Sequence, residues 1–84
     1  MFDLVLYYYP TCPYCRKVTK FIDKHDLEEI ELKNINQDEE AEAELIEVGG
    51  KRQVPCLFIN GKPLYESNDI INLFKFNLVI IINL

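Results

Sequence analysis

Two cysteines separated by two residues are the most reactive feature of the sequence, in a Cys-Pro-Tyr-Cys run at 12–15. The nucleophile that attacks a disulfide is a thiolate, and the positive end of a helix dipole stabilises a thiolate. A helix that begins here would place Cys12 at its N-terminus and Cys15 one turn later, on the same side. Arg16 and Lys17 add positive charge nearby. The spacing therefore predicts thiol–disulfide exchange, in which Cys12 attacks and Cys15 resolves the mixed disulfide.

The same pair could instead be structural, or could supply half of a zinc site. A structural zinc site needs two further ligands at a similar spacing. The remaining candidates, Cys56 and His25, are not paired in that way. Redox chemistry is favoured because the pair follows a strand-like run and opens a helix within a βαβ pattern.

Four short segments have the composition of β-strands. The run 4–9 is apolar on both faces, which is typical of a central strand covered on both sides. Segment 29–33 alternates polar and apolar residues, and 54–59 is a second apolar run. Asn60-Gly61 is a strong hairpin signal, so 62–65 should return antiparallel to 54–59.

The segments between these strands, and the one after the last strand, have the periodicity of helices. Residues spaced along one stripe between 14 and 25 predict the first helix, with Thr11 or Cys12 as N-cap and Pro13 in its first turn. The second helix should bury Ala41, Leu45 and Val48. A capping box from Asn36 to Glu39 should begin the second helix, and a C-cap in the left-handed conformation at Gly49-Gly50 should end it. Ser67 or Asn68 should be the N-cap of the last helix.

The resulting order, βαβαββα, predicts one α/β domain over 1–84. Its first βαβ unit implies parallel, right-handed strand pairing, and the hairpin adds an antiparallel edge. Four strands with helices on both faces make a three-layer sandwich. The segment 76–84 is a mainly apolar tail that this pattern does not explain.

Composition narrows the classes of function. The chain has 84 residues, a formal charge of −5 and 49% hydrophobic residues. That acidic balance argues against binding to nucleic acid or to an anionic membrane, and the apolar content supports a packed core. The N-terminus has no signal-peptide pattern, and no apolar run is long enough to span a bilayer. We therefore expect a reduced, cytoplasmic protein that is a monomer.

Two further segments gain meaning only in combination with the motif. In isolation, Pro55 is a trans proline at the start of a strand, and 65–69 is an ordinary helix start. Together with the Cys-Pro-Tyr-Cys run, however, Val54-Pro55 and the segment 61–70 make the chain resemble a dithiol glutaredoxin over 4–74. The Glu66-Ser67 pair resembles the N-terminal domain of glutathione transferases, which shares this thioredoxin-like fold.

The resemblance implies a glutathione-dependent thiol–disulfide oxidoreductase that acts in cell redox homeostasis and electron transport. Cys12 would attack protein–glutathione mixed disulfides and carry the glutathione, and Cys15 would act on protein disulfides. No tightly bound cofactor or metal is implied, because glutathione is a co-substrate. Pro55 would be cis, and Glu66 or Asp69 would hold the glutathione amino group. The residues assigned to glutathione contacts are Tyr14, Gln53, Val54, Pro55, Glu66, Ser67 and Asn68.

The sequence departs from the family pattern at two places. Many members carry a Lys where this chain has Tyr9, and the missing contact could come from Lys51, Arg52 or Gln53. The usual Gly-Gly before the last helix is replaced by Tyr65-Glu66. Three other hypotheses remain: a thioredoxin-like reductant recharged by a flavoprotein reductase, an iron–sulfur cluster-binding module, and a fragment of a larger transferase.

Overall fold

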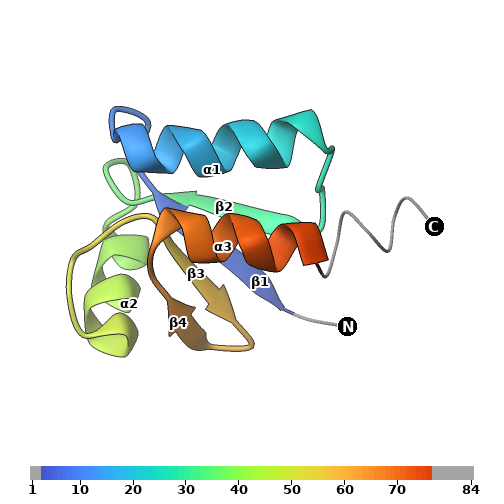
Figure 1. Ribbon diagram of the computed structural model, residues 1–84. Helices are drawn as coiled ribbons and strands as arrows, with labels where there is room; N and C mark the ends of the chain where they lie inside the picture. The colour runs from blue at the N-terminus through green and yellow to red at the C-terminus, as the bar shows by residue number, and fades with distance from the viewer. Residues whose placement is uncertain (1–2, 77–84) are drawn as a thin grey trace.

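The computed structural model describes residues 3–76, which form three helices and a four-stranded sheet (Figure 1). The observed order, βαβαββα, confirms the sequence prediction. The elements are β1 (Leu4–Tyr8), α1 (Pro13–Lys24), β2 (Ile30–Asn34), α2 (Glu39–Gly49), β3 (Cys56–Ile59), β4 (Lys62–Leu64) and α3 (Ser67–Phe74).

The sheet has the strand order β2-β1-β3-β4, so β1 is an inner strand. β1 pairs parallel with β2 and antiparallel with β3, and β4 forms the antiparallel edge. Alternate residues of a strand point to opposite faces. Leu4 and Leu6 belong to one buried cluster and Tyr7 to the other, which explains why this strand is apolar on both faces.

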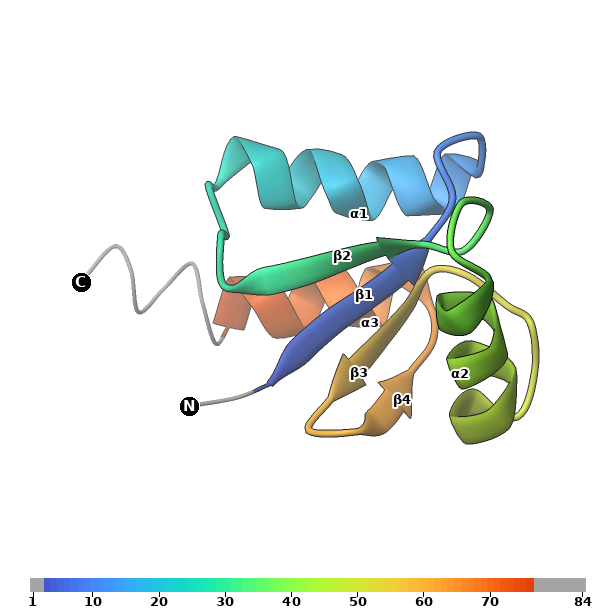
Figure 2. The same cartoon turned by 180° about the vertical axis from the view of Figure 1, so that it is seen from behind.

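Two helices cover one face of the sheet and one helix covers the other. α1 and α3 lie side by side over one face, and α2 lies behind the opposite face (Figures 1 and 2). The cluster between the sheet and α1/α3 includes Val18, Ile22 and Phe74, and the cluster beneath α2 includes Ala41 and Leu45. The three-layer sandwich is therefore confirmed.

The start and the inner face of α2 differ from the sequence prediction. Asp38, rather than an Asn36–Glu39 capping box, caps the helix, because its Oδ1 accepts the N–H groups of Glu40 and Ala41 at 3.1 Å. Val48 is 52% exposed. The inward stripe continues from Leu45 to Gly49, four residues further on, and ends at Gly50 in the left-handed conformation, as predicted.

The start of α3 also differs. Its N-cap is Glu66, which has a φ of 73° and makes no side-chain capping bond. Ser67, expected to be a cap, is the first helical residue instead. The preceding hairpin is as predicted: Asn60 and Gly61 both have positive φ, the requirement of a type I′ turn.

The apolar tail predicted at 76–84 lies, apart from Phe76, outside the described residues. Within residues 3–76, no helix is long and apolar enough to cross a membrane.

The observed cap of α2 can be tested by mutation. We expect Asp38→Ala to lower the free energy of unfolding by about 1 kcal/mol, because two N–H groups lose their acceptor. Asn36→Ala, the matched control, should change it by less than about 0.5 kcal/mol. Urea unfolding followed by circular dichroism measures the free energy of unfolding of both variants. A larger decrease for Asn36→Ala than for Asp38→Ala would contradict the Asp38 cap and favour the capping box.

Candidate functional site

The two cysteines of the motif lie in the first turn of α1. Cys12 is the N-cap, with extended backbone angles, and Pro13 begins the helix as predicted. The amide of Cys15 donates a hydrogen bond to Cys12 Sγ at 3.3 Å. No acidic residue lies in this first turn. A helix N-terminus without carboxylates favours negative charge, so the site suits a thiolate at Cys12.

The second cysteine has a different environment. Cys15 has no exposed surface, whereas Cys12 is 6% exposed. Burial, opposed by a backbone hydrogen bond from Tyr9 and reinforced by interaction with Cys12, raises the pKa of the Cys15 thiol to about 12. Cys15 therefore remains protonated near neutral pH, and Cys12 is the better candidate for the attacking group. Both are free thiols.

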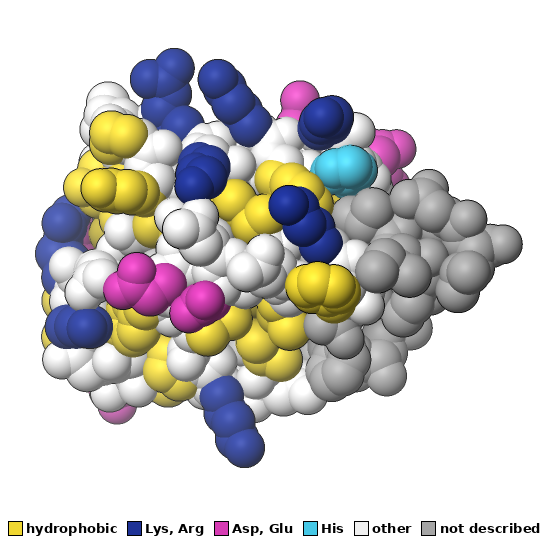
Figure 3. Space-filling view, in the orientation of Figure 1, with side chains coloured by type: hydrophobic (Ala, Val, Ile, Leu, Met, Phe, Trp, Pro, Cys, Tyr) yellow, Lys and Arg dark blue, Asp and Glu magenta, His cyan; other side chains and the backbone are white. Residues whose placement is uncertain are grey.

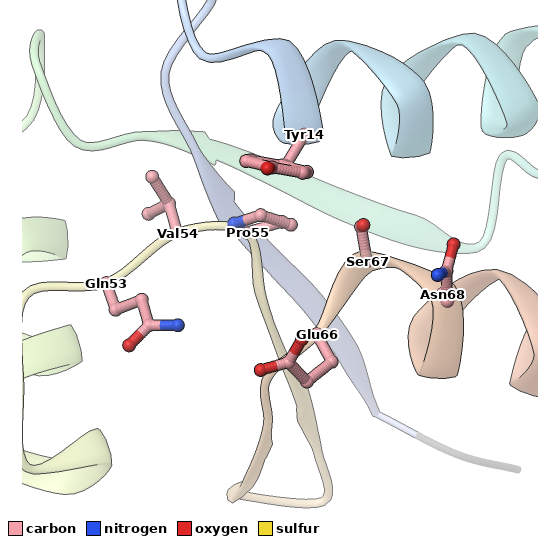
Figure 4. A pocket seen from close by; sticks show the side chains of 7 residues that line it. All are labelled: Tyr14, Gln53, Val54, Pro55, Glu66, Ser67 and Asn68. Carbon is pink, nitrogen blue, oxygen red and sulfur yellow. The ribbon is translucent and has the colours of Figure 1, made fainter.

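A cavity of about 220 Å³ lies beside the start of α1 (Figure 4). Three segments meet there: the first turn of α1, the chain before β3, and the start of α3. Tyr14 extends from α1 over Pro55, and the Val54–Pro55 peptide bond is cis. The lining residues are the seven to which the resemblance assigned glutathione contacts: Tyr14, Gln53, Val54, Pro55, Glu66, Ser67 and Asn68.

The wall formed by α3 presents a helix N-terminus to this cavity. The first amides of a helix have no acceptor within the helix, and the first such bond in α3 runs from the Ile70 amide to the Glu66 carbonyl. Glu66 provides no side-chain cap. The amides of Ser67 and Asn68 are therefore suited to a carboxylate, next to the Glu66 side chain, which suits an ammonium group.

The three residues proposed to replace the missing Lys at position 9 are placed differently. Gln53 lines the cavity. The Arg52 guanidinium lies 5.9 Å from the centre of the Tyr9 ring and contacts Glu42 Oε2 at 3.4 Å. The Lys51 ammonium lies 4.6 Å from the centre of the Tyr65 ring. Gln53 is thus the one of the three that faces the ligand space.

Sequence reasoning missed a contact beside the cavity, made by Tyr65, which precedes the lining residue Glu66. The Tyr65 hydroxyl donates a hydrogen bond to the Gly49 carbonyl at 2.9 Å, linking the end of β4 to the end of α2. A Cβ on Gly49 would collide with that hydroxyl. The Gly-Gly pair was interpreted only as a helix stop. The aromatic residue where the family usually has Gly was the signal for this contact.

Cys56 lies under this contact in β3 and has no exposed surface. Burial raises the pKa of its thiol to about 11, although a hydrogen bond from Tyr65 opposes the shift. Within residues 3–76, no group of three or more Cys, His, Asp or Glu side chains is placed to hold a metal ion.

Comparisons with known proteins match this arrangement. The family model described as Glutaredoxin matches residues 4–64, more than half of the chain. "Glutaredoxin 1" of Rickettsia typhi is 39% identical over 72 residues, which is 83% of this chain and 68% of the relative.

Solved structures give a similar result. Glutathione transferase Omega 3C from Trametes versicolor has a TM-score of 0.74 and 27% identity, over 88% of this chain and 33% of that one. A buckwheat glutaredoxin–glutathione complex has a TM-score of 0.68 and 23% identity, over 94% of this chain and 74% of that one.

The unequal burial of the cysteines predicts selective alkylation. Brief exposure of the reduced protein to iodoacetamide at pH 7 should label Cys12 and spare Cys15 and Cys56. Protection of the latter two should persist at pH 9, because their pKa values of about 12 and about 11 keep them protonated there. Peptide mass spectrometry identifies the labelled sites, and urea-unfolded protein, in which all three react, is the control. Equal labelling of Cys12 and Cys15 would contradict the assigned roles.

Proposed function

This chain belongs to the glutaredoxin family and is a glutaredoxin-type thiol oxidoreductase. We propose that it reduces protein–glutathione mixed disulfides and protein disulfides, with glutathione as the electron donor. The observation that carries the proposal is the juxtaposition of Cys12, at the N-terminus of α1, with a cavity whose groups match the charged ends of glutathione. Cytoplasmic location is part of the proposal, because recharging requires a pool of reduced glutathione.

The first step of the proposed reaction exchanges one disulfide for another. The Cys12 thiolate attacks the glutathione sulfur of the mixed disulfide, a bond forms between these two sulfurs, and the protein substrate departs as a thiolate that takes up a proton. A second glutathione thiolate then attacks the sulfur carried by Cys12. The products are oxidised glutathione and the regenerated Cys12 thiolate. In the net reaction one free glutathione thiol is consumed, one protein thiol is released, and the disulfide bond passes from the protein substrate to a pair of glutathiones.

The cavity supplies complementary groups for a bound glutathione. The α-carboxylate of its γ-glutamyl residue suits the amides of Ser67 and Asn68, and the ammonium group suits the Glu66 carboxylate. Val54 precedes β3 and lies outside the strand pairing, which supports the proposal that its main chain pairs with the ligand's peptide group. The buckwheat complex in the comparison contains glutathione, which supports the same choice of ligand.

The protonation of Cys15 favours the route through glutathione over intramolecular closure. Cys15 must lose its proton before it can attack the Cys12 disulfide, and burial opposes that loss. Once Cys12 is bound in a disulfide, its charge no longer raises the pKa of Cys15, but the burial remains. Cys15 is needed for protein disulfides, because attack by Cys12 then leaves a mixed disulfide with the protein and not with glutathione.

Turnover of a glutathionylated peptide tests the proposal, with glutathione and glutathione reductase supplying electrons. We expect Cys12→Ser to lower the rate to that of the uncatalysed reaction, because a serine hydroxyl is not ionised at neutral pH. Cys15→Ser should retain activity on this substrate and lose it on a protein disulfide. NADPH oxidation provides the rate.

The control is the unfolding transition of each variant, which distinguishes a folded variant that lacks activity from a variant that is inactive because it does not fold. If wild type, folded and with Cys12 titratable, turns over neither substrate, the glutathione proposal fails. Recharging by a flavoprotein thioredoxin reductase would then identify the thioredoxin-like alternative.

The assigned ammonium site is tested separately. Glu66→Gln should raise KM for the glutathionylated peptide by about tenfold, since one charge-assisted hydrogen bond is lost, and should leave kcat little changed. Asp69→Asn is the matched control: this carboxylate is one helical turn away and does not line the cavity, so KM should change by less than about twofold. A larger increase in KM for Asp69→Asn than for Glu66→Gln would contradict this assignment and would identify Asp69 as the residue that binds the ammonium group.

A further inference from the structure

A second hollow lies along the seam between α1 and α3. It has a volume of about 430 Å³ and is lined by Lys17, Lys20, Phe21, Lys24, His25, Ile71 and Lys75. We call it the seam groove. Its centre is apolar, because Phe21 and Ile71 line it. The Phe21 ring stacks on Phe74 at a centroid distance of 6.2 Å and packs at a tilt against His25 at 4.4 Å. On this side of the molecule Lys and Arg side chains stand around hydrophobic atoms over α1, with the single His at one end (Figure 3).

The charge of the seam groove is opposite to that of the rest of the protein. Its four lysines contribute +4 to a chain whose net charge is −5, so all other side chains together carry −9. Among residues 3–76, the ion pairs to carboxylates are those of Lys33 and Arg52, and neither residue lines the groove. Lys20 and Lys24 are a like-charged i,i+4 pair, an arrangement that destabilises a helix. An anionic partner would relieve this repulsion.

The seam groove continues from the glutathione cavity. Tyr14 lines the cavity, and Lys17, Phe21 and Lys24 follow on the same face of α1 at helical spacing. The Lys17 ammonium donates a hydrogen bond to Asn68 Oδ1 at 2.7 Å. Since Asn68 lines the cavity and Lys17 lines the groove, this bond marks the boundary between them.

We infer that the seam groove binds the protein substrate, and that it selects an acidic segment that contains an apolar residue and lies about four to six positions from the reactive cysteine. The inference rests on the proposed function, because it assigns substrate chemistry to the same active site. The apolar side chain would lie against Phe21 and Ile71, and the flanking carboxylates would lie against Lys20, Lys24 and Lys75. A short acidic segment fits better than a long polyanion, which the surrounding charge of −9 would repel.

The geometry fixes the position of the acidic segment. With a rise of about 1.5 Å per residue, Lys20 and Lys24 lie about 12 and about 18 Å along the helix axis from Cys12. An extended chain covers about 3.3 Å per residue, so the acidic residues should lie about four to six positions from the substrate cysteine.

Three labelled peptides test the inference. Each carries one glutathionylated cysteine and a block four to six positions away: Asp-Phe-Glu, Asn-Phe-Gln or Lys-Phe-Lys. Each is made with the block on either side of the cysteine. Fluorescence anisotropy with the Cys12→Ser chain measures binding without turnover, and the coupled assay with wild type measures kcat/KM. The small mixed disulfide of cysteine and glutathione serves as the substrate that does not reach the groove.

We expect the acidic peptide to bind about fivefold more tightly than the neutral one, and its kcat/KM to be higher by the same factor, the size typical of a few exposed charge contacts. The preference should shrink in 0.5 M NaCl. Lys20→Gln/Lys24→Gln should remove it, whereas Lys62→Glu, which makes the same change of two charge units on exposed β4, should preserve it. None of these variants should alter turnover of the small disulfide.

Equal binding and equal turnover of the three peptides would overturn the inference, as would an equal loss of preference in Lys62→Glu. Tighter binding of a single-stranded oligonucleotide than of the acidic peptide would also overturn it and would identify a nucleic-acid surface. Failure of the proposed function is a different result: no turnover of the small mixed disulfide. In that case the anisotropy measurement with its two matched variants still decides whether the seam groove binds acidic segments.

Discussion

The hydrogen bond from the Cys15 amide to the Cys12 sulfur, 3.3 Å long, connects the reactive atom to the positive end of α1. The rest of the fold keeps that helix end in place. β1 leads into it, and β1 is an inner strand held by β2 on one side and β3 on the other. Because both faces of β1 are buried, the loop from 9 to 12 has little freedom to move the sulfur away from the helix axis. A substitution that disrupts the packing of β1 would thus lower the reactivity of Cys12 even though the cysteine itself is unchanged.

The same turn of helix assigns different tasks to two chemically identical side chains. The N-cap position leaves Cys12 outside the helix with 6% of its surface exposed, while Cys15, one turn later, faces the core and has no exposed surface. Desolvation penalises the charged form of a thiol, which is why burial raises the pKa of Cys15 to about 12. A Cys-x-x-Cys motif at a helix start therefore separates the nucleophile from the resolving thiol by geometry, with no further residue required.

Local signals predicted the order of elements and the three layers, because strand runs, a Cys-Pro-Tyr-Cys helix start and an Asn-Gly turn are read from neighbouring residues. The seven residues that line the cavity came from the family resemblance, and their contacts with glutathione stay a prediction. The errors occurred where local signals compete. Asn36 and Asp38 are both good caps, and only the chain path into α2 selects Asp38. Ser67 has the composition of a cap but enters the helix, because the backbone reverses at Glu66 instead. The Tyr65–Gly49 bond and the seam groove join residues far apart in the chain. The aromatic residue at position 65 signals a departure from the family pattern, but a single sequence does not identify its partner.

The replacement of Gly-Gly by Tyr65-Glu66 shows how the site uses tertiary contacts in place of a flexible backbone. A non-glycine residue at a φ of 73° and a ψ of 111° lies in a sparsely populated backbone region, at a cost of about 1–3 kcal/mol, so Glu66 needs support from its surroundings. Tyr65 provides it: its hydroxyl is fixed on the Gly49 carbonyl, and the Lys51 ammonium covers its ring. Gly49 in turn must lack a side chain for that hydroxyl to fit. What the strained residue adds, and glycine could not, is a carboxylate at the edge of the cavity. The unfavourable backbone angle, the aromatic contact and the small residue at the end of α2 are therefore one structural unit, which holds a charged side chain at the lining of the cavity.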